Sequence, residues 1–221
     1  MLTSAQGWEI FHGTILTIEI ALVALFFGVV LGIIVALGRI SHNKVAKAIT
    51  WFYVWFFRGT PLLLQLFMIY FAVPIIYLNV TGSTLVVDPM LCAFITFSLN
   101  STAYMAEIIR AAIESIPEGQ MEAAKALGMN YHQAMRKIII PQTFKRLVAP
   151  LGNELIMLLK DTSLVSTIAL FDVLRTVKTM ATSTGNWVYY LYAAAIYLFL
   201  TTILQVLFDH LEKRFGAYEK R

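Results

Sequence analysis

Several stretches of this chain are apolar for long enough to cross a lipid bilayer as helices. A crossing helix needs about 20 mostly apolar residues, and 59% of the chain is hydrophobic, against roughly 45–50% in soluble domains. Lipid offers the backbone no hydrogen-bond partner, so such stretches must be helical. We therefore predict an all-α membrane protein, a single domain over residues 1–221, with five spans at about 13–38, 59–78, 89–109, 148–171 and 188–208.

The segments in and around the first span carry polar, aromatic and small residues that predict where they lie in the membrane. Residues 1–12 read as a short polar lead, and residues 39–58 read as an amphipathic, aromatic segment at the membrane surface. Within the first span, Gly28 and Gly32 form a pair of small residues four apart, which predicts close contact with another helix. Glu19 is expected about two turns inside the same span, near the interface.

The basic residues predict how the chain is oriented. Five spans put the two termini on opposite sides of the membrane. With the N-terminus outside, 14 of the 17 Lys and Arg residues fall on the cytoplasmic side, with Arg175 and Lys178 outside, in the loop before the last span, and Lys160 within a span. Cytoplasmic loops are enriched in Lys and Arg. The expected orientation is therefore N-terminus out and C-terminus in.

The longest polar gap between spans, within residues 115–141, predicts a helical hairpin. Residues 118–127 are rich in helix formers, and Gly128 suits the left-handed position that ends a helix. Asn130 can cap a second helix, which we expect to run to about Ile140 and to end before Pro141. The small side chains of Ala123, Ala124 and Ala126 would let another protein approach the first helix closely.

This hairpin resembles the EAA loop of bacterial ABC importer permeases. The family pattern is E-A-A, three residues, G, nine residues and I-x-L-P, and Glu122-Ala123-Ala124, Gly128 and Ile138 to Pro141 match it except for Ile140, where Leu is usual. The resemblance implies that residues 117–127 form a coupling helix docked on an ATPase subunit, with Glu122, Ala123, Ala124 and Gly128 at the contact. The alternative is an ordinary cytoplasmic helical hairpin.

Two further strings are similar to the group of these permeases that moves polar amino acids, the histidine, glutamine and arginine permeases. They are RGTPLLLQ at 58–65 and the segment from Gly152-Asn153-Glu154 through Lys160-Asp161-Thr162-Ser163-Leu164. The resemblance implies a type I importer permease in a bacterial cytoplasmic (inner) membrane. It also implies a second permease chain (an identical copy or a close paralogue), two ATPase subunits and an extracytoplasmic solute-binding protein. An acid at the Glu154 position often accompanies basic amino acid substrates.

Other chemistry is not indicated by the sequence. It has no G-x-x-x-x-G-K-[ST] phosphate loop, so ATP and Mg²⁺ are expected on a partner subunit and no cofactor in this chain. The four histidines and Cys92 are scattered without metal-ligand spacing, and no nucleophile–base set or nucleic-acid motif is present. We therefore expect a transport subunit with no catalytic site and no metal site.

Polar residues in the middle of spans three and four are the candidate substrate site. Polar groups are costly in lipid, so they must face protein or water. Asn100, Tyr104 and Glu107 share a face of span three, and Glu154 and Asp161, seven apart, share a face of span four. With Ser101, they could line a cavity for a zwitterionic solute, with Lys160, on a different face, as an internal counter-ion. The alternative is a set of buried ion pairs and hydrogen bonds that fixes helix packing.

These observations leave several functions to compare. An importer of arginine, lysine or histidine is favoured, because two acids on one face suit a cationic side chain. The same importer for glutamine or glutamate is the alternative. An ion-driven transporter that uses Glu19, Glu107 or Asp161 as a proton site is less favoured, since no inverted repeat is visible. A non-transporting scaffold would not need polar residues in the middle of its spans.

Overall fold

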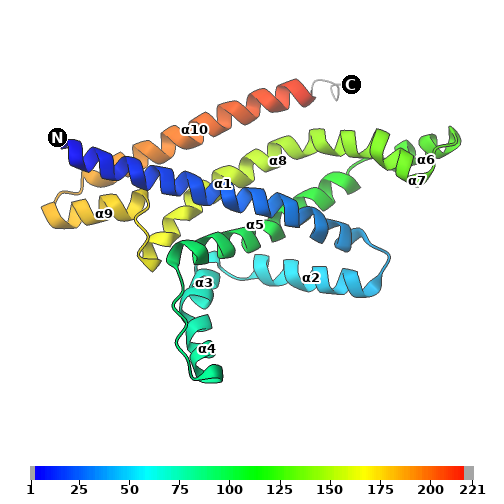
Figure 1. The fold of residues 1–221 in the computed structure, drawn as a ribbon. Helices are drawn as coiled ribbons and strands as arrows, with labels where there is room; N and C mark the ends of the chain where they lie inside the picture. Colours follow the sequence, from blue (N-terminus) through cyan, green and yellow to red (C-terminus); the bar gives the residue numbers. More distant parts are fainter. Residues whose placement is uncertain (1–2, 217–221) are drawn as a thin grey trace.

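The computed structural model describes residues 3–216, and helices make up nearly all of that range (Figure 1). Lys220 and Arg221, which count toward the predicted orientation, lie outside it. In chain order the elements are α1 (Ser4–Ile40), α2 (Lys44–Gly59), α3 (Leu62–Phe67), the π-helical η1 (Met68–Ala72), α4 (Val73–Thr81), α5 (Pro89–Glu114), α6 (Glu118–Ala126), α7 (Tyr131–Ala134), the π-helical η2 (Met135–Ile139), α8 (Ile140–Asp161), the 3-10 helix η3 (Thr162–Ile168), α9 (Val173–Thr184) and α10 (Tyr189–Gly216).

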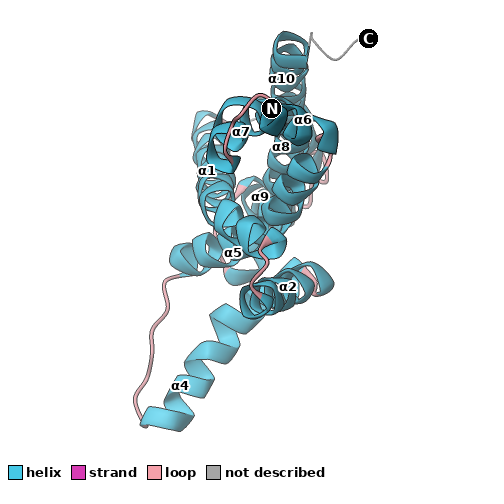
Figure 2. Ribbon diagram, turned by 90° about the vertical axis from the view of Figure 1, so that its right-hand side faces the viewer, coloured by secondary structure: helices cyan, strands magenta, loops and turns pink. Residues whose placement is uncertain are grey.

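The long helices α1, α5, α8 and α10 run roughly lengthwise together, so that Figure 2 views them nearly end-on. Helices α1 and α5 make the closest approach. A Cβ placed on Gly28 would lie 2.3 Å from Ser101 Oγ, and one on Gly32 would lie 2.8 Å from Met105 Cβ. The close helix contact predicted from these two glycines is confirmed.

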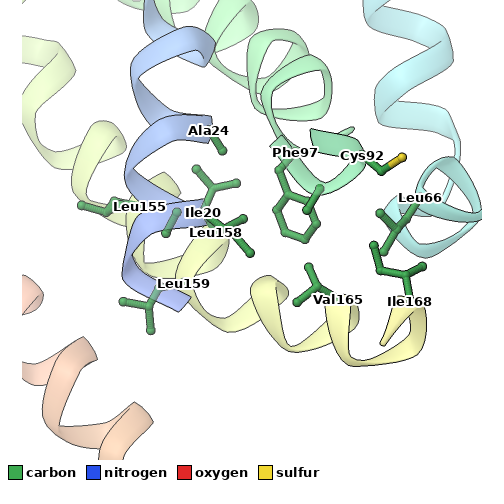
Figure 3. Close-up of a cluster of buried hydrophobic side chains, with 12 residues drawn as sticks. Ile20, Ala24, Leu66, Cys92, Phe97, Leu155, Leu158, Leu159, Val165 and Ile168 are labelled. Atoms are coloured by element: carbon green, nitrogen blue, oxygen red, sulfur yellow. The ribbon is translucent and has the colours of Figure 1, made fainter. Parts of the chain in front are cut away.

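The main hydrophobic core lies where α1, α3, α5, α8 and η3 meet. Figure 3 shows Phe97 of α5 between Ile20 of α1, Leu66 of α3, Leu158 of α8 and Val165 of η3. All five side chains are almost completely buried. Cys92 is also buried in this core. This packing fixes the relative positions of α5 and α8, which carry the polar residues singled out from the sequence.

Three segments are long and apolar enough to cross a membrane, namely Ser4–Ile40, Leu62–Thr81 and Tyr189–Phe215. They correspond to predicted spans one, two and five. Predicted span three lies on α5, and predicted span four on α8 and η3. Buried polar side chains lower the hydropathy of span three, and three charged residues, Glu154, Lys160 and Asp161, lower that of span four. The number of crossings and their orientation therefore remain predictions.

The segment α3–η1–α4 leaves the body of the molecule as a projecting arm, defined as residues 62–81. Figures 1 and 2 show it pointing away from the other helices, across the direction of α1 and α5. The sequence predicted a membrane span over about 59–78 here. Residues such as Ile75, Ile76 and Val80 are more than half exposed, because the arm has few neighbours within its own chain.

Several predicted boundaries were wrong. Helix α1 begins at Ser4, where Thr3 and Gln6 form a capping box, so residues 4–12 belong to the first helix and Glu19 lies about four turns inside it. The segment predicted as a loop before the last span contains α9, with Arg175 and Lys178 on it. The Asp172 carboxylate starts this helix by accepting the backbone N–H groups of Leu174 and Arg175.

Predicted span four, 148–171, was also drawn too far along the chain. The α-helix starts at Ile140 and ends at Asp161, and a 3-10 helix then runs to Ile168. Ala169 follows in the left-handed region with φ 68°. The residues after Asp161 mix Thr and Ser with Leu, Val and Ile, a composition that does not distinguish this short 3-10 segment from the end of an α-helix.

The second helix of the hairpin does not end before Pro141, as the sequence had suggested. It continues through η2 into α8. Proline lacks an N–H group, and its ring collides with the carbonyl four residues earlier. The wide turn of η2 accommodates it, with the Ile140 N–H donating to the Met135 carbonyl, five residues back. The arm has the same kind of π-helical turn, η1, before Pro74, where the Val73 N–H donates to the Met68 carbonyl.

Candidate functional site

A cavity of about 370 Å³ lies where the α2–α3 junction meets α5 and α8. Four of the predicted substrate residues line it, namely Asn100 and Tyr104 from α5 and Glu154 and Asp161 from α8. The remaining wall comes from the junction, residues 58–62, and from Met157 and Leu158. The structure thus brings together side chains that are 54 positions apart in sequence, from Asn100 to Glu154.

Asn100 is held in place by a buried neighbour, Gln65 of α3. The Asn100 amide nitrogen donates to Gln65 Oε1 at 3.0 Å and to the Phe57 carbonyl at 3.2 Å. The Gln65 amide nitrogen in turn donates to the Phe57 carbonyl and to the carbonyl and hydroxyl of Thr60. Both donor hydrogens of Asn100 are thereby used, so its carbonyl oxygen is the group left for a ligand.

The two acids of α8 line the cavity without forming an ion pair. Glu154 is 6% exposed, and among residues 3–216 its carboxylate forms no ion pair. Its polar neighbours are the Ser101 hydroxyl and, further away, the charged groups of Arg58 and Asp161. Asp161 is half-buried two turns further along. Lys160 is exposed and does not line the cavity. Its charge acts on the adjacent Asp161, and its role as an internal counter-ion stays a prediction. A buried carboxylate without a partner is costly, which favours a role in binding a cation.

Arg58 is a cavity residue that the sequence analysis did not assign. Its guanidinium lies 5.2 Å from the centre of the Tyr104 ring, and it lines the same cavity as the two acids. In the sequence it begins the RGTPLLLQ string, which carries the resemblance to permeases but does not show where the side chain lies. Only the fold shows that the chain turns at this point and carries Arg58 and Tyr104 to the same place.

Ser101 and Glu107, in contrast, do not line this cavity. Ser101 packs against Gly28 of α1, and its hydroxyl also lies close to the Glu154 carboxylate. Glu107 forms ion pairs with Arg39 at 3.1 Å, with Arg110 at 2.7 Å and with Arg58 at 3.8 Å. Contrary to the sequence prediction, Glu107 does not share a cavity with Asn100 and Tyr104, because it lies about two turns beyond Asn100 and its carboxylate is turned toward these arginines.

The hairpin has the local geometry expected from its sequence. Gly128 has φ +79°, and Asn130 accepts the Gln133 N–H in a capping box. Glu122 and Ala123 are exposed on α6, whereas Ala124 is 1% exposed. Ala124 therefore packs inside the hairpin instead of offering a surface to another protein. No cluster of His, Cys, Asp or Glu able to hold a metal ion occurs within the described part of the chain.

Three related transport proteins share most of their length with this chain. An arginine transport system permease protein from Corynebacterium glutamicum is 39% identical, over 96% of this chain and 72% of the relative. An L-cystine transport system permease protein from Bacillus subtilis is 37% identical, over 98% of this chain and 91% of the relative. A glutamine transport system permease protein from Rickettsia bellii, itself named as putative, is 36% identical, over 93% and 92%.

Solved structures agree on the fold. The crystal structure of an amino acid ABC transporter with histidines matches with a TM-score of 0.86 at 34% identity, over 97% of this chain and all of that chain. A methionine ABC transporter in an inward-facing conformation matches with a TM-score of 0.77 at 20% identity, which supports the fold alone.

The fold is therefore that of type I ABC importer permeases, and its place is the inner membrane. The profile of one family, the inner membrane components of binding-protein-dependent transport systems, matches residues 28–217. That match takes in the cavity and the hairpin. The chain belongs to this family, as a membrane-spanning transport subunit and not an enzyme.

Proposed function

We propose that this permease moves polar amino acids into the cytoplasm and prefers those with a basic side chain. The single observation that supports this most is the pair of acids, Glu154 and Asp161, which face the cavity without a basic partner within hydrogen-bonding distance. A cationic side chain would offset the cost of burying Glu154. The arginine permease from Corynebacterium glutamicum adds support by its similarity.

The other polar groups of the cavity suit the constant part of an amino acid. The free donors of Arg58 can take the α-carboxylate, since guanidinium and carboxylate form paired hydrogen bonds. The Asn100 carbonyl oxygen can accept from the α-ammonium group, because Gln65 and the Phe57 carbonyl hold its amide nitrogen away. In this arrangement the α8 acids bind the side chain of the substrate, whereas Arg58 of α2 and Asn100 of α5 bind its α-carboxylate and α-ammonium groups.

Glutamine or another neutral amino acid is the second candidate. It is favoured by Arg58, which adds a positive charge to the cavity, and by relatives that are named for glutamine and cystine transport. Under this alternative Glu154 would accept hydrogen bonds from a side-chain amide. An ion-driven transporter is not supported, because Glu107 is paired with arginines and the family works with binding proteins.

We also propose the partners that such a subunit needs. Two ATPase subunits would carry ATP and Mg²⁺, and the α6–α7 hairpin would dock on one of them through Glu122, Ala123 and Gly128. Ala124 would support this surface from beneath. An extracytoplasmic protein would deliver the amino acid, and a second permease chain, a copy or a paralogue, would complete the pathway. Closure of the ATPase subunits would move α5 and α8 relative to each other.

Substrate preference can be tested with Glu154→Gln in the reconstituted transporter. A hydrogen bond to a charged group contributes about 1.5–3 kcal/mol, so we expect the KM for arginine to rise roughly tenfold or more, with a much smaller effect for glutamine. Uptake and amino acid-stimulated ATP hydrolysis measure both. Glu9→Gln, the same change at an exposed position on α1, is the control. An equal effect on both amino acids would reject the preference for basic substrates.

A further inference from the structure

A second cavity, of about 310 Å³, lies between α2, the C-terminal end of α1 and α5. Arg39, Arg58, Trp51, Trp55 and Glu107 line it, and we call it the arginine pocket. It shares Arg58 and Gly59 with the amino acid cavity, but Asn100, Glu154 and Asp161 belong to that cavity and not to this pocket. The arginine pocket is thus a separate space with one wall in common.

The arginine pocket carries an excess of positive charge. Three guanidinium groups, those of Arg39, Arg58 and Arg110, surround the Glu107 carboxylate. Glu114 pairs with Arg110 on its outer side, so two carboxylates face three arginines and one positive charge is left over. Because these groups are partly buried, water screens this charge less than it would at an open surface.

The guanidinium groups of Arg39 and Arg58 also have N–H donors that are not used in hydrogen bonds to Glu107. The Glu107 oxygens accept hydrogen bonds from Arg39 Nε and from Nε and Nη2 of Arg110. Arg58 Nη1 stays 3.8 Å away, beyond hydrogen-bond distance. Within residues 3–216, the terminal nitrogens of Arg39 have no acceptor. Arg39 and Arg58 therefore both line the arginine pocket with guanidinium N–H groups that Glu107 does not bind. Such N–H groups suit the oxygens of a phosphate.

An aromatic surface of α2 adjoins these donors. Trp51 and Trp55 stack with their ring planes 10° apart, and both, like Phe52, are more than half exposed. Indole rings favour the level of the lipid head groups. Lys44 and Lys47 extend the positive charge at the start of the same helix. A ligand in the pocket would thus have its phosphate on the arginines and an apolar portion along α2.

We propose that the arginine pocket binds the phosphate of an anionic phospholipid, whose acyl chains lie on the exposed aromatic surface of α2. The excess positive charge favours a head group without a cation of its own, such as phosphatidylglycerol, over phosphatidylcholine. Basic pockets between membrane helices are suited to such head groups. Inorganic phosphate has the same oxygen chemistry without the chains, so it distinguishes a soluble anion from a lipid.

The test measures lipid binding to the delipidated transporter by native mass spectrometry. Phosphatidylglycerol and phosphatidylcholine with identical chains are titrated in parallel, with inorganic phosphate as a third arm. We expect phosphatidylglycerol to bind at least about fivefold more tightly than phosphatidylcholine, from one unbalanced cationic group at the membrane. Arg39→Gln should remove most of this difference. Arg214→Gln, at an exposed arginine near the end of α10, should leave it unchanged.

Two more measurements keep the proposal testable if Arg39→Gln folds poorly. Glu107→Gln removes a negative charge from the pocket and should tighten phosphatidylglycerol binding, whereas a purely structural ion pair predicts no such gain. A photoactivatable phosphatidylglycerol should crosslink wild-type protein mainly within residues 39–58. Equal binding of the two lipids, crosslinks spread evenly over the helices, or Arg39-dependent binding of inorganic phosphate alone would each overturn the lipid site. Amino acid uptake is a separate readout, since Arg39 does not line the amino acid cavity.

Discussion

Single residues set how closely the two central helices approach. Gly28 of α1 lies so near α5 that an added Cβ would come within 2.8 Å of Ser101 Cβ. Ser101 itself is fully buried, so it has no open space to move into. The pair is best understood as a packing contact. The Ser101 hydroxyl also lies beside Glu154, so the role of Ser101 in substrate binding stays a prediction.

Gly28→Ala should therefore destabilise the protein. Overpacking a tight contact costs about 1–3 kcal/mol, and we expect a lower melting temperature in detergent, followed by intrinsic fluorescence. Gly7→Ala in the same helix is the control, because no atom lies within 4 Å of its added Cβ. That variant should be neutral, or more stable by about 0.5–1 kcal/mol, since Ala favours helix over Gly. Equal melting temperatures for both variants would argue against the close contact.

The candidate site shows how far residue types alone can predict function. Asn100, Glu154 and Asp161 stand out because polar residues inside apolar spans need a reason to be there. Arg58 and Gln65 are the first and last residues of the RGTPLLLQ string, but the sequence assigns neither of them to the cavity. Their importance comes from the turn at Thr60 and Pro61, which brings α2 and α3 against α5. Such a long-range contact cannot be derived from local pattern.

At the scale of elements, the sequence predicted the residues that cap or end helices, but it did not predict that a helix continues across a proline. Gly128 and Asn130 carry strong local signals, and the structure has both in the expected conformations. Pro141 was taken as a helix end because proline breaks the α-helical hydrogen-bond pattern. A single π-helical turn lets the helix continue past the proline. No residue type in the segment predicts such a turn.

The Asn130 cap should contribute to the local stability of the hairpin against unfolding. Its side chain accepts the Gln133 N–H at 2.9 Å while Gln133 returns a bond to the Asn130 N–H. Losing a cap costs about 1 kcal/mol, so Asn130→Ala should speed amide hydrogen exchange roughly fivefold in residues 118–134. Asn43→Ala removes the corresponding cap of α2 and serves as the matched control. It should leave exchange in the hairpin unaffected, and an unchanged hairpin in Asn130→Ala would contradict the role of the cap.

At the scale of the whole molecule, the sequence predicted which segments are helices better than where they point. The arm of residues 62–81 has the length and apolarity of a membrane span, yet it projects across the other helices (Figure 2). Direction depends on what a helix packs against, and the arm has few partners within its own chain. The cavity and the hairpin lie on the same two long helices: the cavity on α5 and α8, and the hairpin between their ends. A displacement of the hairpin would therefore be transmitted to the cavity residues along α5 and α8.

Gly128→Asp should uncouple ATP hydrolysis from uptake in the assembled transporter. The position is exposed, has space for a side chain and has φ +79°, a conformation that Asp tolerates better than most residues. The fold should thus persist, while a new charge beside the exposed Leu127 disturbs the proposed contact with the ATPase subunit. We expect uptake to fall at least about tenfold with hydrolysis retained, since one unpaired charge at a contact costs about 1–3 kcal/mol. Gly82→Asp, with φ +70° and similar free space, places the same change at the far tip of the arm and should transport normally. Normal uptake by Gly128→Asp would show that the hairpin does not couple the two subunits at this residue.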